Sequence, residues 1–510
     1  MTTLIKNILL IDGSNQPPIK ADVLIKGEKI AAIGSFPRYQ ADTVIDGVGA
    51  YLAPGFIDIN TTSDRYLTIF SNPQQKHFLL QGITTIIGGQ DGISLAPLLY
   101  GSLDLQKFWT DPYQINVDWH TVGELLRVLD RRKIGVNFGT LIGHSTIRHT
   151  LIGDEFRDLT QKELDVFQFM AERSLQEGAF GISFDLHSPV AALIPGKEIK
   201  ILLETIERHR ALASFKLRVG SDTTVYGADM KEQFVPSANE IINLSKETGV
   251  RAQLNNFAPL NGLESEYDQI IETIHANAAT ADVYFNLHPF ERSVIPIVSF
   301  LPIWARRGGF EDIGKAIKSD EAAEKIKKEL IPFDGDDVII YDAPGFDHLV
   351  GRTIKGFGED RGLSPQDALI ELMRITGLRS TLLYHNLSLG SFDKAILSDR
   401  SIIASSGASF ADKSNTMSHV HIFDRCIPKF FELSGINNII PIETAVRKIT
   451  SLPAQRLGIK DRGMIKEGYY ADLVLFRDAT IETVFVNGAI AVRDGVYTDM
   501  VNGTILRYAP

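Results

Sequence analysis

The sequence contains one cysteine, Cys426, among 510 residues. A framework of internal disulfide bonds is therefore excluded, and a single thiol is typical of a protein that stays in a reducing compartment. The sequence also lacks any run near the roughly 18 apolar residues of a membrane-spanning helix. Its first residues, Met1 to Lys6, do not have the charged and then apolar layout of a secretion signal. We therefore expect a cytoplasmic protein that does not enter membranes.

Basic residues are fewer than acidic residues. Lys and Arg number 52 against 63 Asp and Glu, which gives a formal net charge of -11 at pH 7. Such a surface repels phosphate groups, so we expect neither nucleic acid nor an anionic membrane as a partner. Hydrophobic residues make up 44% and charged residues 23% of the chain, which is the ordinary balance of a globular protein.

Both ends of the chain alternate apolar and polar residues, with turn residues at short intervals. Residues 1–52 and 462–510 each contain several short strand patterns, separated by pairs such as Asp12-Gly13 and Asn487-Gly488. Neither piece is long enough to bury a core alone. We therefore expect the two pieces to join into one small, discontinuous β-sandwich domain.

The middle of the chain, residues 53–461, alternates strand-like and helix-like segments, which is typical of βα units around a parallel sheet. Eight parallel strands with crossover helices close into a TIM (β/α)8 barrel, whose chemistry lies at the C-terminal ends of the strands. The predicted fold class is therefore α/β, with a barrel and a composite β-sandwich. The eight buried strand candidates are 52–62, 84–92, 135–144, 178–185, 212–219, 251–258, 282–290 and 401–408.

The gap between the seventh and eighth strand candidates is too long for a single crossover. Residues from about 291 to 400 therefore contain an insertion, with a charged surface helix expected from Ser319 to Leu330. Two interpretations stay open. The insertion is either additional surface or a lid over the mouth of the barrel.

Polar side chains follow each of the eight strand candidates. Since the C-terminal ends of parallel strands meet at one edge, we expect these side chains to face a common pocket. A single polar residue after a strand is ordinary, but eight in succession predict a site. The residues are Asn60 and Thr62, Asp91, His144, Asp185, Lys216 with Arg218, Asn255 with Asn256, His288, and Ser405 with Ser406.

Several short motifs occur in a distinctive order, among them Pro54-Gly55-Phe56-Ile57-Asp58, Gly143-His144-Ser145 and Leu452-Pro453-Ala454-Gln455-Arg456-Leu457-Gly458. Their order and spacing resemble the N-acyl-D-amino-acid deacylases, the D-aminoacylase branch of the amidohydrolases, over nearly the whole chain. The resemblance implies hydrolysis of a non-peptide C–N bond by a zinc-activated water, with an Asp of the eighth strand moving the proton.

The positions that the resemblance assigns to metal ligands are substituted almost throughout. Amides and hydroxyls bind zinc poorly and an ammonium repels it, so only Asp91 remains a competent ligand. We therefore predict no zinc and no other cofactor. In place of the residues that the resemblance implies, this sequence has Asn60 and Thr62 for the paired His of the first strand, Asp91 for the Cys of the second and Lys216 for the His of the fifth. It has Asn256 and Ala258 for the His and the substrate-anchoring Lys of the sixth strand, His288 for the aromatic residue of the seventh and Ser406 for the Asp of the eighth.

Lys216 is the most informative of these substitutions. A buried carboxylate without its cation is costly, so we expect the Lys216 ammonium to take the vacated metal position and pair with Asp91. The alternative is that Lys216 extends to water. His144 is either a base or metal ligand or a packed, hydrogen-bonded histidine, and His419 with His421 could chelate a metal only if a third ligand joined them.

Two functions compete. The first is a degenerate homologue that has lost its metal centre and binds a small molecule, or acts as the partner of an active paralogue or of a second copy of itself. The second is an active C–N hydrolase with a metal-free or rearranged-metal mechanism, in which Asp91, Lys216 and His288 are the catalytic candidates. In both cases Arg218, Lys216 and His288 could together hold an anionic ligand. The predicted ligand-binding residues are Asn60, Thr62, His144, Arg218, Asn256, His288 and Ser406.

Overall fold

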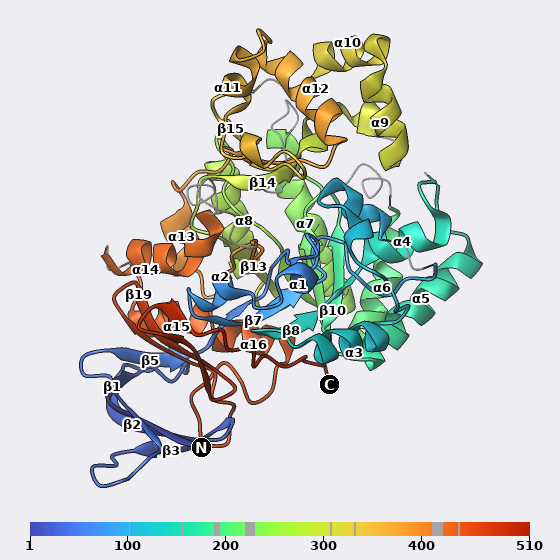
Figure 1. Ribbon diagram of the computed structural model, residues 1–510. Helices are drawn as coiled ribbons and strands as arrows, with labels where there is room; N and C mark the ends of the chain where they lie inside the picture. The colour runs from blue at the N-terminus through green and yellow to red at the C-terminus, as the bar shows by residue number, and fades with distance from the viewer. Residues whose placement is uncertain are drawn as a thin grey trace.

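The structure is a computed structural model that describes residues 1–100, 103–155, 157–187, 194–219, 230–306, 309–330, 333–410, 422–436 and 439–509. The chain has a mixed α/β fold in which three regions follow one another in space (Figure 1). A β-sheet built from both ends of the chain lies at one end, a body of parallel strands and helices lies in the middle, and a mostly helical region lies at the other end.

One nine-stranded sheet joins the N-terminal and C-terminal segments. Its order is β21-β20-β19-β18-β5-β1-β2-β3, and β4 pairs with β1. The two ends of the chain meet where β18 runs antiparallel to β5, with Val474 opposite Ala53. The strands are β1 (Thr2–Leu10), β2 (Ile19–Lys26), β3 (Lys29–Gly34), β4 (Thr43–Asp46), β5 (Tyr51–Pro54), β18 (Leu473–Arg477), β19 (Thr480–Val486), β20 (Ala489–Arg493) and β21 (Val496–Tyr497).

The central body contains parallel strands in two sheets, ordered β6-β7-β8 and β17-β13-β12-β11-β10-β9. Only Leu141 separates β8 from β9, so the third predicted strand contributes to both sheets. Each of the eight predicted segments overlaps one of these strands, and the third overlaps two, β8 and β9. The strands are β6 (Phe56–Asp58), β7 (Ile83–Gly88), β8 (Asn137–Thr140), β9 (Ile142–Gly143), β10 (Gly181–Asp185), β11 (Leu212–Lys216), β12 (Arg251–Leu254), β13 (Val283–Leu287) and β17 (Ser401–Ile403).

The end of the last strand lies beside the end of the first. Thr62 N donates a hydrogen bond to Gly407 O at 2.8 Å, and Ser406 N donates to Asn60 O at 3.0 Å. The buried Asp58 carboxylate also accepts a bond from Ser405 N at 3.0 Å. These bonds bring residues from opposite ends of the central body to one place.

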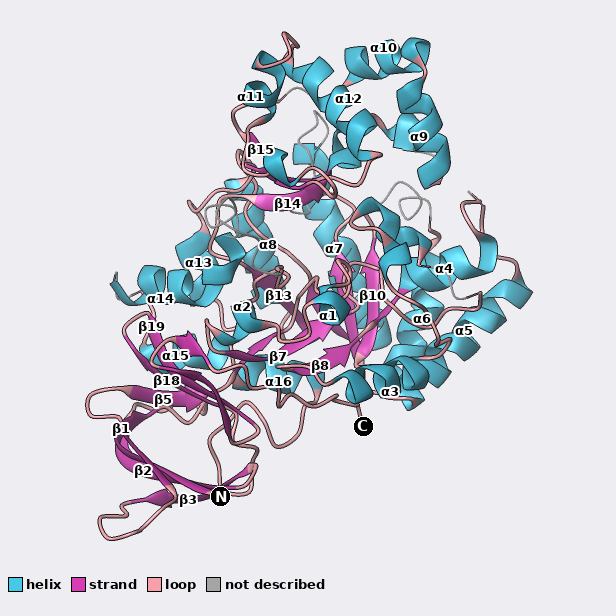
Figure 2. Cartoon of the chain, viewed as in Figure 1, coloured by secondary structure: helices cyan, strands magenta, loops and turns pink. Residues whose placement is uncertain are grey.

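Helices cover the parallel strands on the outside (Figure 2). The amphipathic pattern after Thr160 forms α5, which begins with a capping box between Thr160 and Glu163 and buries Leu164, Phe167 and Met170 on one side. The helices of the central body are α1 (Thr68–Ser71), α2 (Lys76–Leu79), α3 (Val122–Arg132), α4 (His144–Ile152), α5 (Gln161–Gln176), α6 (Gly196–Arg208), α7 (Met230–Thr248), α8 (Glu264–Ala276), α13 (Phe392–Leu397), α14 (Cys426–Ile436), α15 (Ile442–Lys448) and α16 (Ser451–Leu457).

The region between β13 and β17 has a hydrophobic core of its own, which includes Ile295, Ile326 and Leu372. The predicted charged helix is confirmed as α10, whose first turn is capped by the Ser319 hydroxyl. The elements are β14 (Ser293–Pro296), β15 (Val338–Asp342), β16 (Thr381–Tyr384), the short 3₁₀ helix η5 (Ile303–Arg306), α9 (Phe310–Lys318), α10 (Asp320–Glu329), α11 (Ile354–Glu359) and α12 (Pro365–Thr376).

Among the helices that the structure describes, none combines the length and the apolar composition needed to cross a bilayer.

Candidate functional site

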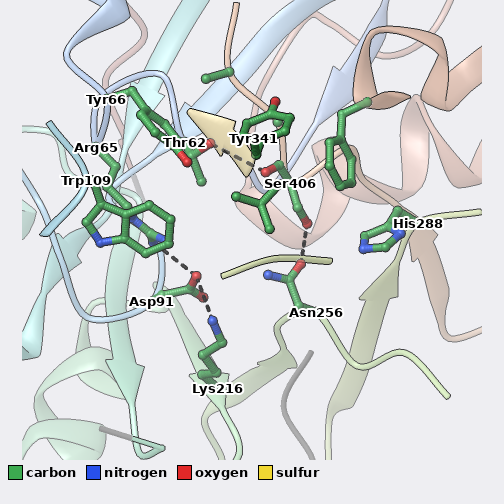
Figure 3. A pocket seen from close by; sticks show the side chains of 14 residues that line it. Thr62, Arg65, Tyr66, Asp91, Trp109, Lys216, Asn256, His288, Tyr341 and Ser406 are labelled. Atoms are coloured by element: carbon green, nitrogen blue, oxygen red, sulfur yellow. Dashed lines mark hydrogen bonds and ion pairs between the residues drawn. The ribbon is translucent and has the colours of Figure 1, made fainter. Parts of the chain in front are cut away.

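Two adjoining cavities open at the C-terminal ends of the parallel strands. The first, here called the inner cavity, encloses about 410 Å³ of space, part of it open to solvent. The second, the outer cleft, has about 1240 Å³ of space, which also includes open solvent, and shares Arg65, Asp91, Trp109 and Lys216 with the inner cavity. The inner cavity is lined by the strand-end residues Thr62, Asp91, Lys216, Asn256, His288 and Ser406 and by the aromatic residues Tyr66, Trp109, Tyr341 and Phe423 (Figure 3).

Asp91 is the centre of a buried charged cluster. Its Oδ2 accepts hydrogen bonds from Arg65 at 3.0 Å and from the Lys216 ammonium at 3.3 Å, and its Oδ1 accepts one from Asn255 at 2.7 Å. Burial pushes the pKa of Asp91 upward, but the charges of Lys216 and Arg65 outweigh it, so that the pKa lies well below its usual value. The carboxylate is therefore ionised at neutral pH and held by two cations.

The predicted pairing of Lys216 with Asp91 is confirmed by this geometry. The Lys216 side chain is 3% exposed, so it does not extend to water. It comes from the last residue of β11, and the register of the sheet places Asp185 of β10 directly beside it. Arg65 adds a second cation, whose guanidinium also lies 4.6 Å from the ring centre of Trp109.

A second network is neutral and joins the ends of β6, β12 and β17. The Asn60 amide donates to Asn256 Oδ1 at 2.5 Å and to Ser406 Oγ at 3.0 Å, and Ser406 Oγ donates to Asn256 Oδ1. Asn256 and Ser406 have left-handed backbones, with φ of 51° and 56°. Asn tolerates this conformation well but Ser less so, which marks a place where the chain is held against its preference.

His288 lies across the inner cavity from Asp91 and Trp109 (Figure 3). The side chain is 2% exposed, and neither ring nitrogen has a hydrogen-bond partner in the part of the chain that the structure describes. Burial lowers its pKa to about 4, so the imidazole is neutral near pH 7. A neutral imidazole carries one donor and one acceptor nitrogen. His288 can therefore offer both to a molecule in the cavity.

The cavities do not include all of the predicted site residues. His144 begins α4 and turns toward α6, where its Nε2 lies 2.9 Å from Glu198 Oε1, so it is placed as a packed, hydrogen-bonded histidine. Arg218 makes two bonds to Glu240, at 2.8 and 3.0 Å, and lines neither cavity in the described structure. Asn60 is fully buried beneath the inner cavity. His419 and His421 lie outside the described residues.

Sequence reasoning missed several residues that line these cavities. Arg65 directly follows the strand-end run that ends at Asp64, and a pairing argument for Asp91 could have included it. Trp109 and Tyr341 come from segments without a recognisable motif. Arg306 of η5 lines the outer cleft from the region between β13 and β17, which shows that this region contributes a wall of the site.

Known proteins resemble this chain in sequence and in fold. Residues 389–492 match the sequence model of the Amidohydrolase family. A D-aminoacylase from Alcaligenes xylosoxydans xylosoxydans is 26% identical over 98% of this chain and 96% of that protein, and an N-acyl-D-aspartate deacylase from the same organism is 26% identical over 98% and 91%. The crystal structure of a D-aminoacylase superposes with a TM-score of 0.76 at 25% identity over 99% of both chains. The chain is D-aminoacylase-like.

A second solved structure is similar to this chain in fold alone. The N-acyl-D-glutamate deacylase from Bordetella bronchiseptica, solved with zinc and a phosphonate inhibitor, superposes with a TM-score of 0.76 at 21% identity over 99% of both chains. Within the described part of this D-aminoacylase-like protein, no three His, Cys, Asp or Glu side chains gather as a group that could hold a metal ion.

Proposed function

We propose that this D-aminoacylase-like protein binds a small N-acylated, anionic molecule at its strand ends and does not hydrolyse its C–N bond with zinc. The relatives named D-aminoacylase and N-acyl-D-aspartate deacylase support the ligand class. The observation that carries the proposal is the pairing of Asp91 with Lys216 and Arg65. We place the site at the mouth of a (β/α)8 barrel formed by residues 53–461, beside a composite β-sandwich domain of residues 1–52 and 462–510.

The donor chemistry argues against zinc. Asp91 is the one residue at the substituted metal-ligand positions that could bind zinc well, and two buried cations already neutralise it. A divalent cation placed there would meet the repulsion of the ammonium and the guanidinium at short distance. The amides of Asn60 and Asn256 and the Ser406 hydroxyl are weak zinc ligands, and they bond to one another.

One observation favours the second candidate function, metal-free hydrolysis of a C–N bond. His288 faces the inner cavity with both ring nitrogens free of partners in the described chain, as a proton acceptor would. However, a pKa of about 4 makes it a weak base near neutral pH. Asp91 is a still weaker base because its pKa is depressed. Binding therefore accounts for the geometry better than catalysis.

Metal content and ligand binding test the proposal together. Protein purified from zinc-supplemented cells is expected to contain zinc well below one equivalent per chain by mass spectrometry, and calorimetric titration with a panel of N-acetyl-D-amino acids is expected to show binding that EDTA does not change. Stoichiometric zinc, together with hydrolysis that EDTA abolishes, would refute it. Hydrolysis that resists EDTA and disappears in His288→Phe would establish the second candidate instead.

A further inference from the structure

Among the described residues that line the outer cleft, one arginine makes no ion pair. Arg306 lines the cleft from the C-terminal end of η5, and its Nε is buried without a hydrogen-bond partner among the described residues. Its guanidinium makes no ion pair within the described chain, although Asp185 attracts it across the cleft. A buried guanidinium nitrogen without an acceptor is unfavourable unless another group supplies one.

The other cations of the cleft already have partners. Arg65 and Lys216 both bond to Asp91. Arg148 makes two bonds to Glu198, at 2.8 and 2.7 Å. His149 lies 3.7 Å from Asp104 and 3.4 Å from Asp154. Elimination therefore leaves Arg306 as the cation that is available to a ligand.

The charge balance of the cleft indicates a ligand with one negative charge. Arg148 is set aside with Glu198, and His149 and Lys107 are set aside with Asp154 and Asp104, because each of these groups carries no net charge. Three cations, Arg65, Lys216 and Arg306, then face two carboxylates, Asp91 and Asp185. The excess is a single positive charge. A monoanion neutralises this excess, whereas a dianion would leave one negative charge without compensation.

The rest of the cleft wall is largely apolar and comes from two parts of the chain. Phe108 and Phe310 pack edge to face with ring centres 5.1 Å apart, which joins the 3₁₀ helix Asp104–Phe108 of the central body to α9. The opening left between these parts suits an apolar chain rather than a second polar group. The apolar residues of the wall are Ile93, Leu105, Phe108, Ile194, Pro296, Val298 and Ile313.

We infer that the outer cleft binds an amphipathic monoanion, an acyl chain that carries one carboxylate, and that Arg306 is the anchor for the carboxylate. The inference rests on the proposed function and deepens it. In the family that the chain resembles, a Lys of the sixth strand is implied as the anchor, and here that position is the buried Ala258. The anchor is thus supplied by a different element, η5 of the region between β13 and β17.

The experiment compares two probes and three variants by calorimetric titration. The probes are N-octanoylglycine and its neutral amide. The variants are Arg306→Gln, Arg306→Lys, and Lys318→Gln as a matched control that removes one positive charge from the exposed face of α9. Circular dichroism and thermal unfolding establish that each variant is folded.

The wild type is expected to bind the acid at least tenfold more tightly than the amide. Arg306→Gln is expected to weaken binding of the acid about tenfold or more, which corresponds to about 1.4 kcal/mol, and to leave binding of the amide unchanged. Arg306→Lys is expected to bind the acid with an affinity between those of the wild type and Arg306→Gln, because lysine keeps the charge but lacks the planar guanidinium. Lys318→Gln is expected to bind both probes as the wild type does.

Two results would overturn the assignment of Arg306. One is an Arg306→Gln variant that binds the acid with wild-type affinity. The other is a wild type that binds neither probe, or binds both equally. Either result concerns the anchor and the ligand class. The metal analysis and the N-acetyl-D-amino acid titrations decide the proposed function separately, so the two failures are distinguishable.

Discussion

Removal of the Lys216 ammonium is the sharpest test of the charged cluster. At 3.3 Å from Asp91 Oδ2, the two charges attract each other by about 5 kcal/mol at an effective dielectric constant of about 20. Part of this attraction is offset in Lys216→Met, because the variant has no ammonium to desolvate on folding. Arg65 also still holds the Asp91 carboxylate at 3.0 Å. We therefore expect Lys216→Met to lower the free energy of unfolding by about 2–4 kcal/mol.

Urea unfolding at pH 7, followed by circular dichroism, measures this loss. Lys200→Met is the matched control, because Lys200 pairs with Glu247 at 3.0 Å but both side chains are about half exposed. An exposed pair of this kind contributes at most about 1 kcal/mol. The double variant Lys216→Met with Asp91→Asn removes both charges and should be more stable than Lys216→Met alone. A Lys216→Met protein as stable as the control would refute the reasoning.

The pH dependence of stability provides an independent check of the same cluster. The pKa of Asp91 is lower in the folded protein than its ordinary value of 3.8. Its ionised form therefore stabilises the fold fully above about pH 4, and this contribution is lost as the pH falls further toward the folded pKa. The difference in unfolding free energy between the wild type and Asp91→Asn should accordingly shrink below pH 4. A difference that stays constant down to pH 2 would contradict the assignment.

Three further predictions concern other residues of the site. His288→Phe should keep or raise the unfolding temperature, because it removes buried nitrogens without partners, yet weaken binding of N-acetyl-D-amino acids in calorimetry; a clear loss of stability would show that the imidazole is satisfied. Ser406→Asp, which restores the acidic residue implied by the resemblance, should still yield protein without stoichiometric zinc, because Asn60 and Thr62 cannot supply ligands. The pKa of His149 is raised to about 9 by Asp104 and Asp154, so its stabilising effect is complete below pH 6.5 and lost as the pH rises through about 9; the unfolding temperatures of the wild type and His149→Gln should therefore converge above pH 9.

The sequence predicts the framework of this protein well because hydrophobic pattern and burial are local properties. Strands such as Leu212–Lys216 are buried throughout, and a short apolar run that ends in a polar residue identifies both the strand and the residue at its end. The same logic locates Asp91, Lys216 and His288 at one place. It also predicts α10, whose exposed face carries most of its charges.

The partners of these residues are much harder to predict, because they depend on the direction of side chains in three dimensions. His144 and Lys216 both follow strands, yet His144 begins a helix and turns outward to Glu198, whereas Lys216 ends its strand and turns inward. Arg306 lies about ninety residues beyond Lys216 in the sequence, and only the packing of the region between β13 and β17 brings it to the cleft. No local pattern contains that information.

The substitutions at the strand ends compensate for one another, which explains how they can occur together in a folded protein. A metal ion ties together the residues that ligate it, and here two sets of direct bonds perform that task. Asp91 with Lys216 and Asn255 joins the ends of β7, β11 and β12, while Asn60 with Asn256 and Ser406 joins those of β6, β12 and β17.

Asn60, Asp91, Lys216, Asn256 and Ser406 therefore each have a partner that is itself at a substituted position. A single reversion, such as Asn256→His, breaks bonds on two sides without creating a metal site. Because the groups left behind are buried, we expect it to lower the free energy of unfolding by about 1–3 kcal/mol. Urea unfolding of Asn256→His at pH 7 measures this, and wild-type stability in that variant would mean that the strand ends do not depend on the network.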